Sequence, residues 1–220
     1  RFQASRWLRG AHRQTIWPLL IKGPLPPYRR QRWDTPDGDF IDLDWVDGVP
    51  GQPCVVLFHG LEGSSNSAYA RALMRAIHAR GWHGVVVNFR GCSGEPNRLP
   101  RAYHSGDATE VDWILRRLHA LRWPALFATG VSLGGNVLLK WLAENAPADQ
   151  AAGLLNAAAT VSAPVDLAAA ESELARGVKR AYVRYFLRSL IPKALEKAAR
   201  FPDLMDAATI RRSRTLREFD

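Results

Sequence analysis

The chain has 220 residues, of which 47% are hydrophobic and 23% are charged. This composition is typical of one globular domain with a buried core and argues against a disordered chain. No stretch reaches the roughly 18 consecutive apolar residues of a membrane span, and the apolar cluster at 16–21 is too short, and too interrupted by Pro18, for a secretory signal. Cys54 and Cys92 are too few for a disulfide framework, and no Cys/His group has metal-ligand spacing. We therefore expect a cytoplasmic protein with no metal and no other cofactor.

The net charge of +9 is distributed unevenly along the chain. Residues 1–33 hold eight Lys or Arg and no acid, residues 34–160 have a net charge of −3, and residues 161–220 have a net charge of +4. A basic arm attracts phosphates or an anionic membrane surface. A solvated arm that lies over the domain explains the charge equally simply and is the interpretation we favour. No nucleic-acid-binding motif accompanies the charge, so nucleic acid is not an expected partner.

The first elements alternate between strand and helix. Residues 33–46 alternate around a turn signal at 36–39, which predicts an antiparallel hairpin at a sheet edge. The continuous apolar run 54–58 is typical of a strand buried on both faces. A helix that Ser67 can cap and that Gly81 ends comes next, and 84–89 is the following strand.

The alternation continues through the middle of the chain. Asp107 and Glu110 form a capping signal for a second amphipathic helix. Residues 125–131 predict a strand, 133–145 a helix, and 154–161 a weaker strand rich in alanine. The predicted fold is α/β, with a mostly parallel sheet flanked by helices. Since no strand is predicted after Pro164, we divide the chain into a basic arm (1–33), an α/β core (34–163) and a partial helical lid (164–220).

The sequence Gly130-Val131-Ser132-Leu133-Gly134 joins the predicted strand 125–131 to the predicted helix 133–145. In a G-x-S-x-G turn, small residues on either side let a serine stand on a strained strand-to-helix turn as a nucleophile. The helix that follows points its positive N-terminal end at the site. The motif alone is weak, but its place between a strand and a helix makes Ser132 the candidate nucleophile.

A second candidate element, His59-Gly60-Leu61, follows strand 54–58 directly. In proteins with such a serine turn, the loop after this strand supplies one backbone N–H of the oxyanion hole, and the residue after the nucleophile supplies the other. Those donors would be Leu61 and Leu133. Gly60 allows the backbone to approach a substrate closely, and His59 is expected to shape the loop and not to act as the base.

Three segments, "FHGLEGSSNSAYA", "NFRGCSGEPNRLPRAYHSGD" and "GVSLGGNVLLKWL", together resemble the YheT-like branch of the α/β-hydrolase superfamily. "RGAHRQTIWPLL" near the start and "TLREFD" at the end extend the resemblance over nearly the whole chain. The resemblance implies an α/β-hydrolase fold and a serine carboxylesterase or acyl-lipid hydrolase, with Ser132 as the nucleophile and His59-Gly60-Leu61 as the oxyanion loop.

The sequence has no histidine after Ser132 that could serve as the base of the expected site. All six histidines precede Ser132, whereas the chain order in this fold is Ser, then Asp or Glu, then His. Proteins of this branch continue with more lid and two further strands that carry the acid and the histidine. We therefore expect the triad to be completed by residues beyond Asp220, and Asp166 to be a helix cap.

Two functions of different classes remain open at this point. In the first, the intact gene product hydrolyses short-chain or acyl-lipid esters, and the 220 residues alone are inactive. In the second, the chain is a non-catalytic hydrolase-fold protein that binds a small apolar or acyl ligand. Acyltransferase or perhydrolase chemistry on the same scaffold is also compatible with the sequence.

Overall fold

The computed structural model describes residues 3, 5–20, 23–145, 153–174 and 176–219, and its centre is one mixed sheet. Within these residues the strands follow the order β1-β2-β4-β3-β5-β6. Strand β2 is antiparallel to both β1 and β4, and the other pairs are parallel. The strands are β1 (Arg29–Asp34), β2 (Phe40–Val46), β3 (Cys54–Phe58), β4 (His83–Asn88), β5 (Leu126–Val131) and β6 (Ala157–Val161).

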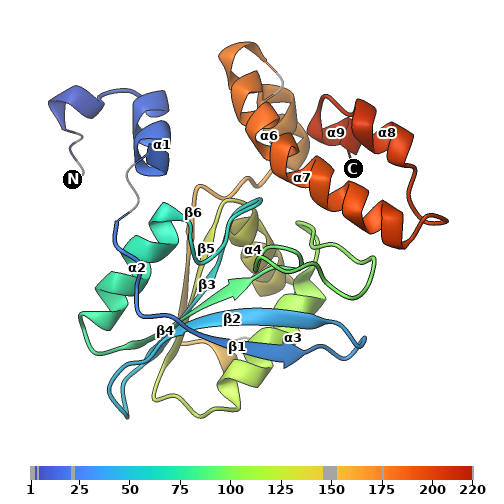
Figure 1. The fold of residues 1–220 in the computed structure, drawn as a ribbon. Coiled ribbons are helices and arrows are strands. Elements are labelled where there is room, and N and C mark those ends of the chain that lie inside the picture. Colours follow the sequence, from blue (N-terminus) through green and yellow to red (C-terminus); the bar gives the residue numbers. More distant parts are fainter. Residues whose placement is uncertain (1–2, 4, 21–22, 146–152, 175, 220) are drawn as a thin grey trace.

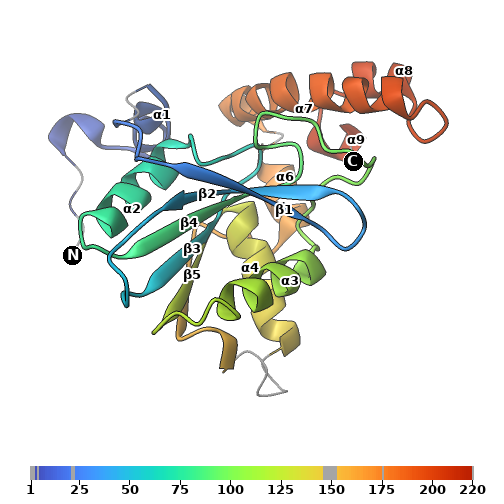
Figure 2. The same ribbon diagram turned by 60° about the horizontal axis from the view of Figure 1, so that its bottom comes forward.

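Helices cover both faces of the sheet (Figure 2). On one face lies α2 (Ala68–His78), and on the other lie α3 (Ala108–His119) and α4 (Leu133–Asn145). The alternation of β3 explains this arrangement, because successive side chains of a strand point to opposite faces. Val56 and Phe58 pack with α3 and α4, whereas Val55 and Leu57 pack with α2.

The C-terminal helices, the segment that we expected to be a lid and call the lid below, lie at the top of Figure 1, above the end of the sheet where β3 and β5 end. They are α6 (Leu167–Leu174), α7 (Arg180–Arg200), α8 (Ala207–Arg212) and α9 (Leu216–Phe219), with a 3₁₀ turn η3 (Gly177–Lys179) before α7. The arm contributes a 3₁₀ turn η1 (Arg6–Leu8) and α1 (Ala11–Leu20). It meets the lid where His12 and Tyr182 share a hydrogen bond of 3.0 Å.

The fold predicted from the sequence is confirmed: a mixed sheet flanked by helices, with the hairpin at one edge. The predicted strand 154–161 is shorter than expected and begins at Ala157. Asn156 explains the start, because its N–H donates to Leu126 O while its side-chain oxygen accepts from Leu126 N–H. Alanine has little preference for strands, so this boundary depends on pairing with β5.

The long loop between β4 and α3 is held by a buried ion-pair cluster. Arg90, 1% exposed at its side chain, contacts Asp39 at 3.1 Å and Glu110 at 2.6 Å. Asp39 also accepts hydrogen bonds from Asn97 Nδ2 and from the Arg98 N–H. Buried charges are stable only when they are paired in this way. The cluster therefore fixes the loop against the β1–β2 turn and α3, on the same side of the sheet as the lid.

Candidate active site

Ser132 lies between β5 and α4 with φ at +53°, the left-handed region that residues other than glycine rarely adopt. Two hydrogen bonds hold it there. Its N–H donates to Val161 O at 2.9 Å, and its carbonyl accepts from the Asn136 N–H at 2.9 Å. The strained strand-to-helix turn expected from the sequence is therefore present at this serine.

The flanking glycines are required by close backbone contacts. A Cβ on Gly130 would lie 2.4 Å from Gly134 O, and one on Gly134 would lie 2.3 Å from Phe58 O. Real Cβ atoms essentially never approach this closely. Since Phe58 ends β3, the Gly134 contact brings the serine turn against the start of the loop that follows β3.

Gly60 places that loop beside the serine. A Cβ on Gly60 would lie 3.1 Å from Ser132 Cβ and 3.8 Å from Ser132 Oγ. The structure thus brings together two segments 72 positions apart in the sequence, as their motifs predicted. Leu61 follows Gly60 directly and Leu133 follows Ser132 directly, so both predicted donors stand one residue from this contact.

Around Leu61, the neighbouring N–H groups already have acceptors. Gly60 N–H donates to Tyr69 Oη at 2.9 Å, and Glu62 N–H donates to Tyr103 Oη at 2.8 Å. Gly63 N–H donates to Gly60 O at 2.9 Å. Leu61 N–H has no acceptor anywhere in the described part of the chain. An N–H that has no acceptor within the protein, in a loop that is partly open to solvent, is available to a ligand.

His59 is wholly buried behind this loop, and both of its ring nitrogens are occupied. Its Nε2 accepts from the Phe89 N–H at 3.0 Å, which leaves Nδ1 as the protonated nitrogen that donates to Gly60 O at 2.7 Å. Burial lowers the pKa of His59 to about 4, so the ring is neutral at physiological pH. This geometry agrees with the loop-shaping role expected of His59.

The other titratable residues that the sequence offered are engaged in local structure. His104 Nδ1 accepts from the Gly106 N–H, and Asp107 caps α3 by accepting from the Glu110 N–H. Asp166 accepts from the Ala169 N–H at the start of α6, as expected for a helix cap. None of the hydrogen bonds made by the described histidines involves Ser132.

Sequence reasoning missed three residues that hold the candidate oxyanion loop: Tyr69, Tyr103 and Glu62. Tyr69 lies in the first turn of α2, and its hydroxyl reaches the Gly60 N–H. Glu62 has φ at +53°. An acidic residue enclosed by small and apolar neighbours in "HGLEG" was the available signal, since a buried carboxylate requires partners.

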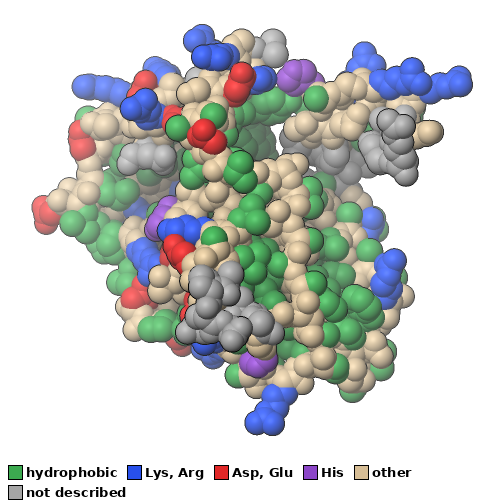
Figure 3. All heavy atoms as spheres, turned by 180° about the vertical axis from the view of Figure 1, so that it is seen from behind, with side chains coloured by type: hydrophobic (Ala, Val, Ile, Leu, Met, Phe, Trp, Pro, Cys, Tyr) green, Lys and Arg blue, Asp and Glu red, His purple; other side chains and the backbone are tan. Residues whose placement is uncertain are grey.

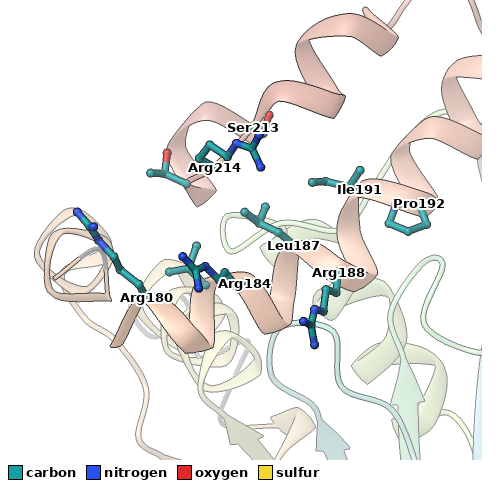
Figure 4. A pocket seen from close by; sticks show the side chains of 10 residues that line it. Arg180, Arg184, Leu187, Arg188, Ile191, Pro192, Ser213 and Arg214 are labelled. Atoms are coloured by element: carbon teal, nitrogen blue, oxygen red, sulfur yellow. The ribbon is translucent and has the colours of Figure 1, made fainter. Parts of the chain in front are cut away.

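A cavity of about 840 Å³ lies on the outer side of the lid, between α7 and residues 213–215 (Figure 4). Leu187 and Ile191 line it, with Arg184, Arg214 and Ser213 around them. None of the residues that surround Ser132 lines this cavity. We therefore do not assign it to the candidate site.

Across the described ranges there is no group of three or more His, Cys, Asp or Glu residues that could hold a metal ion. In the same ranges, no helix combines the length and the apolar character needed to cross a bilayer.

Comparisons with known proteins identify the family of the chain. Residues 53–218 match the family model described as the alpha/beta hydrolase fold. The Escherichia coli protein YheT, whose name makes it a candidate esterase, is 43% identical over 231 residues, which cover 100% of this chain and 65% of YheT. Phospholipase ABHD3 from Bos taurus is 29% identical over 97% of this chain and 54% of its own length.

Among solved structures, an esterase from Pyrococcus furiosus superposes with a TM-score of 0.57 at 16% identity. The match covers 77% of this chain and 71% of the esterase. At this level of identity the similarity bears on the fold alone. The chain spans between half and two thirds of the length of the two curated relatives described above.

Proposed function

Because the chain belongs to the α/β-hydrolase fold family, we propose that it carries the nucleophile and the oxyanion hole of a serine hydrolase acting on carboxylic esters. Ser132 Oγ attacks the ester carbonyl, and the Leu61 and Leu133 N–H groups stabilise the negative charge that develops on the carbonyl oxygen. His59, Gly60, Gly130 and Gly134 support the loop and the turn that hold these atoms.

The observation that carries this proposal is the unpaired Leu61 N–H beside a strained serine. The N–H groups of Gly60, Glu62 and Gly63 are each paired, so the loop leaves one donor free next to Ser132. A fixed donor that does not reorganise during the reaction is the main requirement of an oxyanion hole.

The substrate class is proposed from the relatives. YheT is named as a candidate esterase and ABHD3 as a phospholipase. Short-chain or acyl-lipid esters are therefore the substrates we propose. Their hydrolysis needs a base to take the proton of Ser132, and we propose that the acid and the histidine lie outside residues 1–220.

We further propose that the protein acts in the cytoplasm with its arm at an anionic membrane surface. Arg6, Arg9 and Arg13 are exposed, and the arm also exposes Trp7 (55%) and Trp17 (38%). Figure 3 shows arginine side chains projecting from the arm at the upper right. Arginine and tryptophan together are typical of segments that lie at a membrane interface.

Active-site labelling tests the nucleophile. In a protein that includes the proposed acid and histidine, Ser132→Ala should abolish both the turnover of p-nitrophenyl esters and the labelling by a fluorophosphonate, a loss on the order of 10⁶-fold in the rate constant. Ser93→Ala is the matched control, since Ser93 also stands next to a glycine in a loop, and it should keep both signals.

Assays of residues 1–220 alone test whether the base lies outside this range. Without a base the Ser132 hydroxyl stays protonated, so turnover should remain close to background. Ordinary turnover by residues 1–220 that is lost in His104→Ala or His59→Ala would instead identify an upstream histidine as the base, and it would contradict this part of the proposal.

A further inference from the structure

Glu62, in the candidate oxyanion loop, joins that loop to the lid. Its side chain is only 4% exposed, and Oε2 contacts Lys193 Nζ of α7 at 2.7 Å. The Ser189 hydroxyl, also on α7, donates to the same oxygen. Oε1 accepts from the Tyr103 hydroxyl at 2.9 Å. The carboxylate therefore has partners on two different elements, the lid helix and the loop before α3.

Tyr103 also fixes the backbone of Glu62. The Tyr103 hydroxyl accepts from the Glu62 N–H while it donates to the Glu62 carboxylate. Burial raises the pKa of Tyr103 well above its ordinary value, so the hydroxyl remains a donor. This closed pair of hydrogen bonds supports the left-handed conformation of Glu62, at φ +53°. Leu61 thus lies between two fixed peptide groups, Gly60 held by Tyr69 and Glu62 held by Tyr103.

Helix α7 meets the core through one face only. Ser189, Lys193 and Lys197 are spaced four residues apart, so they share a face. Lys197 Nζ donates to the carbonyls of Pro100 and Arg101, in the loop that leads to Tyr103. Leu187 and Ile191 lie on the opposite face and line the outer cavity (Figure 4). The face that seats the lid is therefore the face that holds Glu62.

Lifting α7 would remove two donors from a carboxylate that is almost fully buried. A buried carboxylate that loses a cation and a hydroxyl partner is costly. A Glu62 carboxylate that turned toward water would lose its hydrogen bond from the Tyr103 hydroxyl, which is the same group that holds the Glu62 N–H. The Leu61 N–H is one residue away from that change.

We propose that Glu62 is a positioning residue that couples the seating of α7 to the orientation of the Leu61 N–H. The oxyanion hole is then complete only when the lid is closed. This proposal rests on the proposed function for its catalytic consequence, but the contact itself can be tested without turnover.

The two cysteines report lid opening and unfolding separately. Cys92 Sγ lies 3.9 Å from Glu62 Oε1 and 4.0 Å from Lys193 Nζ, and burial raises its pKa to about 12. Cys54 is fully buried in β3. Because only an exposed thiolate reacts, an alkylating reagent should reach Cys92 when α7 lifts and Cys54 only when the sheet unfolds.

The labelling rates of both cysteines are measured by mass spectrometry in 220-residue variants. Lys193→Met should raise the Cys92 rate about tenfold, the factor that one hydrogen bond to a charged group contributes to an equilibrium. Removing the Lys193 ammonium would by itself slow the alkylation of Cys92. A faster Cys92 rate in Lys193→Met therefore reports opening of the lid. Lys179→Met removes a lid ion pair with Glu173 and should leave the Cys92 rate unchanged. An unchanged Cys92 rate in Lys193→Met, or an equal rise at Cys54, would overturn the coupling.

Catalysis is then measured in a protein that includes the proposed acid and histidine. Lys193→Met should lower kcat about tenfold with little change in KM, because a misdirected N–H weakens the transition state more than substrate binding. Lys193→Arg should restore most of kcat, and Lys179→Met should keep it. Faster Cys92 labelling with an unchanged kcat would overturn the positioning role. Faster labelling in a protein with no esterase activity in any form would support the contact and reject the proposed function.

Discussion

Replacing His59 by glutamine should produce a loss of stability that depends on pH. Burial lowers the pKa of His59 from about 6.5 to about 4. Between these values the unfolded chain binds a proton that the folded chain does not, so the free energy of unfolding falls as the pH is lowered. Each pKa unit corresponds to about 1.4 kcal/mol, so the contribution of His59 amounts to about 3 kcal/mol. It is fully present above about pH 6.5 and is lost as the pH falls toward 4.

Glutamine can still pair with the Phe89 N–H and Gly60 O, but it does not titrate. The destabilisation caused by His59→Gln should therefore be largest at pH 7 and smaller by about 3 kcal/mol at pH 4. Urea unfolding followed by tryptophan fluorescence at several pH values measures this difference, and the titration of carboxylates cancels between the two proteins. His78→Gln, near the end of α2, is the control. If the difference in the free energy of unfolding between wild type and His59→Gln stays constant from pH 7 to pH 4, the conclusion that His59 is buried in its neutral form is refuted.

Two further predictions follow from the turn and the arm. Gly134→Ala should destabilise the fold by about 3 kcal/mol and lower its melting temperature, because the added Cβ would lie 2.3 Å from a backbone oxygen. Gly153→Ala is the control. It should change the melting temperature little, since there is open space around the added atom. Replacing Arg6, Arg9 and Arg13 by glutamine should weaken binding to acidic vesicles roughly 100-fold. Raising the salt concentration should likewise weaken binding of the wild-type chain, as measured by vesicle sedimentation. Sedimentation that does not depend on salt would contradict the membrane role and would mean that the arm only packs on the domain.

The serine turn could be predicted from the sequence because its determinants are local. A strand, a glycine-flanked serine and a helix stand within about twenty residues, and the contacts of Gly130 and Gly134 are short-range consequences of that order. The partner loop could be placed because parallel neighbouring strands end at the same edge of a sheet. The pairing of β3 with β5 provides that geometry.

The support of the loop could not be predicted in the same way. Glu62 and Lys193 are separated by 131 positions, and no periodicity relates a loop residue to one helix face of a lid. The neutrality of His59 follows from its burial, and its pairing with the Phe89 N–H is possible only because β3 and β4 are adjacent. Such features depend on which groups tertiary packing leaves without partners, and not on local sequence.

The charge of the basic arm also could not be interpreted correctly from the sequence alone. Charge counting treats its eight basic residues as equivalent, but Arg29, Arg30 and Arg32 lie on β1 and pair with acids that include Asp47, Asp44 and Asp42. These charges are largely neutralised at the edge of the sheet. Any attraction to an anionic surface therefore rests on the residues before β1.

The two sides of the candidate oxyanion loop are supported unequally. Gly60 is held by Tyr69, which belongs to α2, a helix that packs on the sheet through Ala70, Met74 and Ile77. Glu62 is held by Tyr103 and by the lid, and Tyr103 in turn stacks on Phe89 at 5.4 Å between ring centroids. Loss of the lid contact therefore removes support from one side only. The loop should stay folded but lose its fixed orientation, which is why we expect kcat to fall without a matching loss of stability.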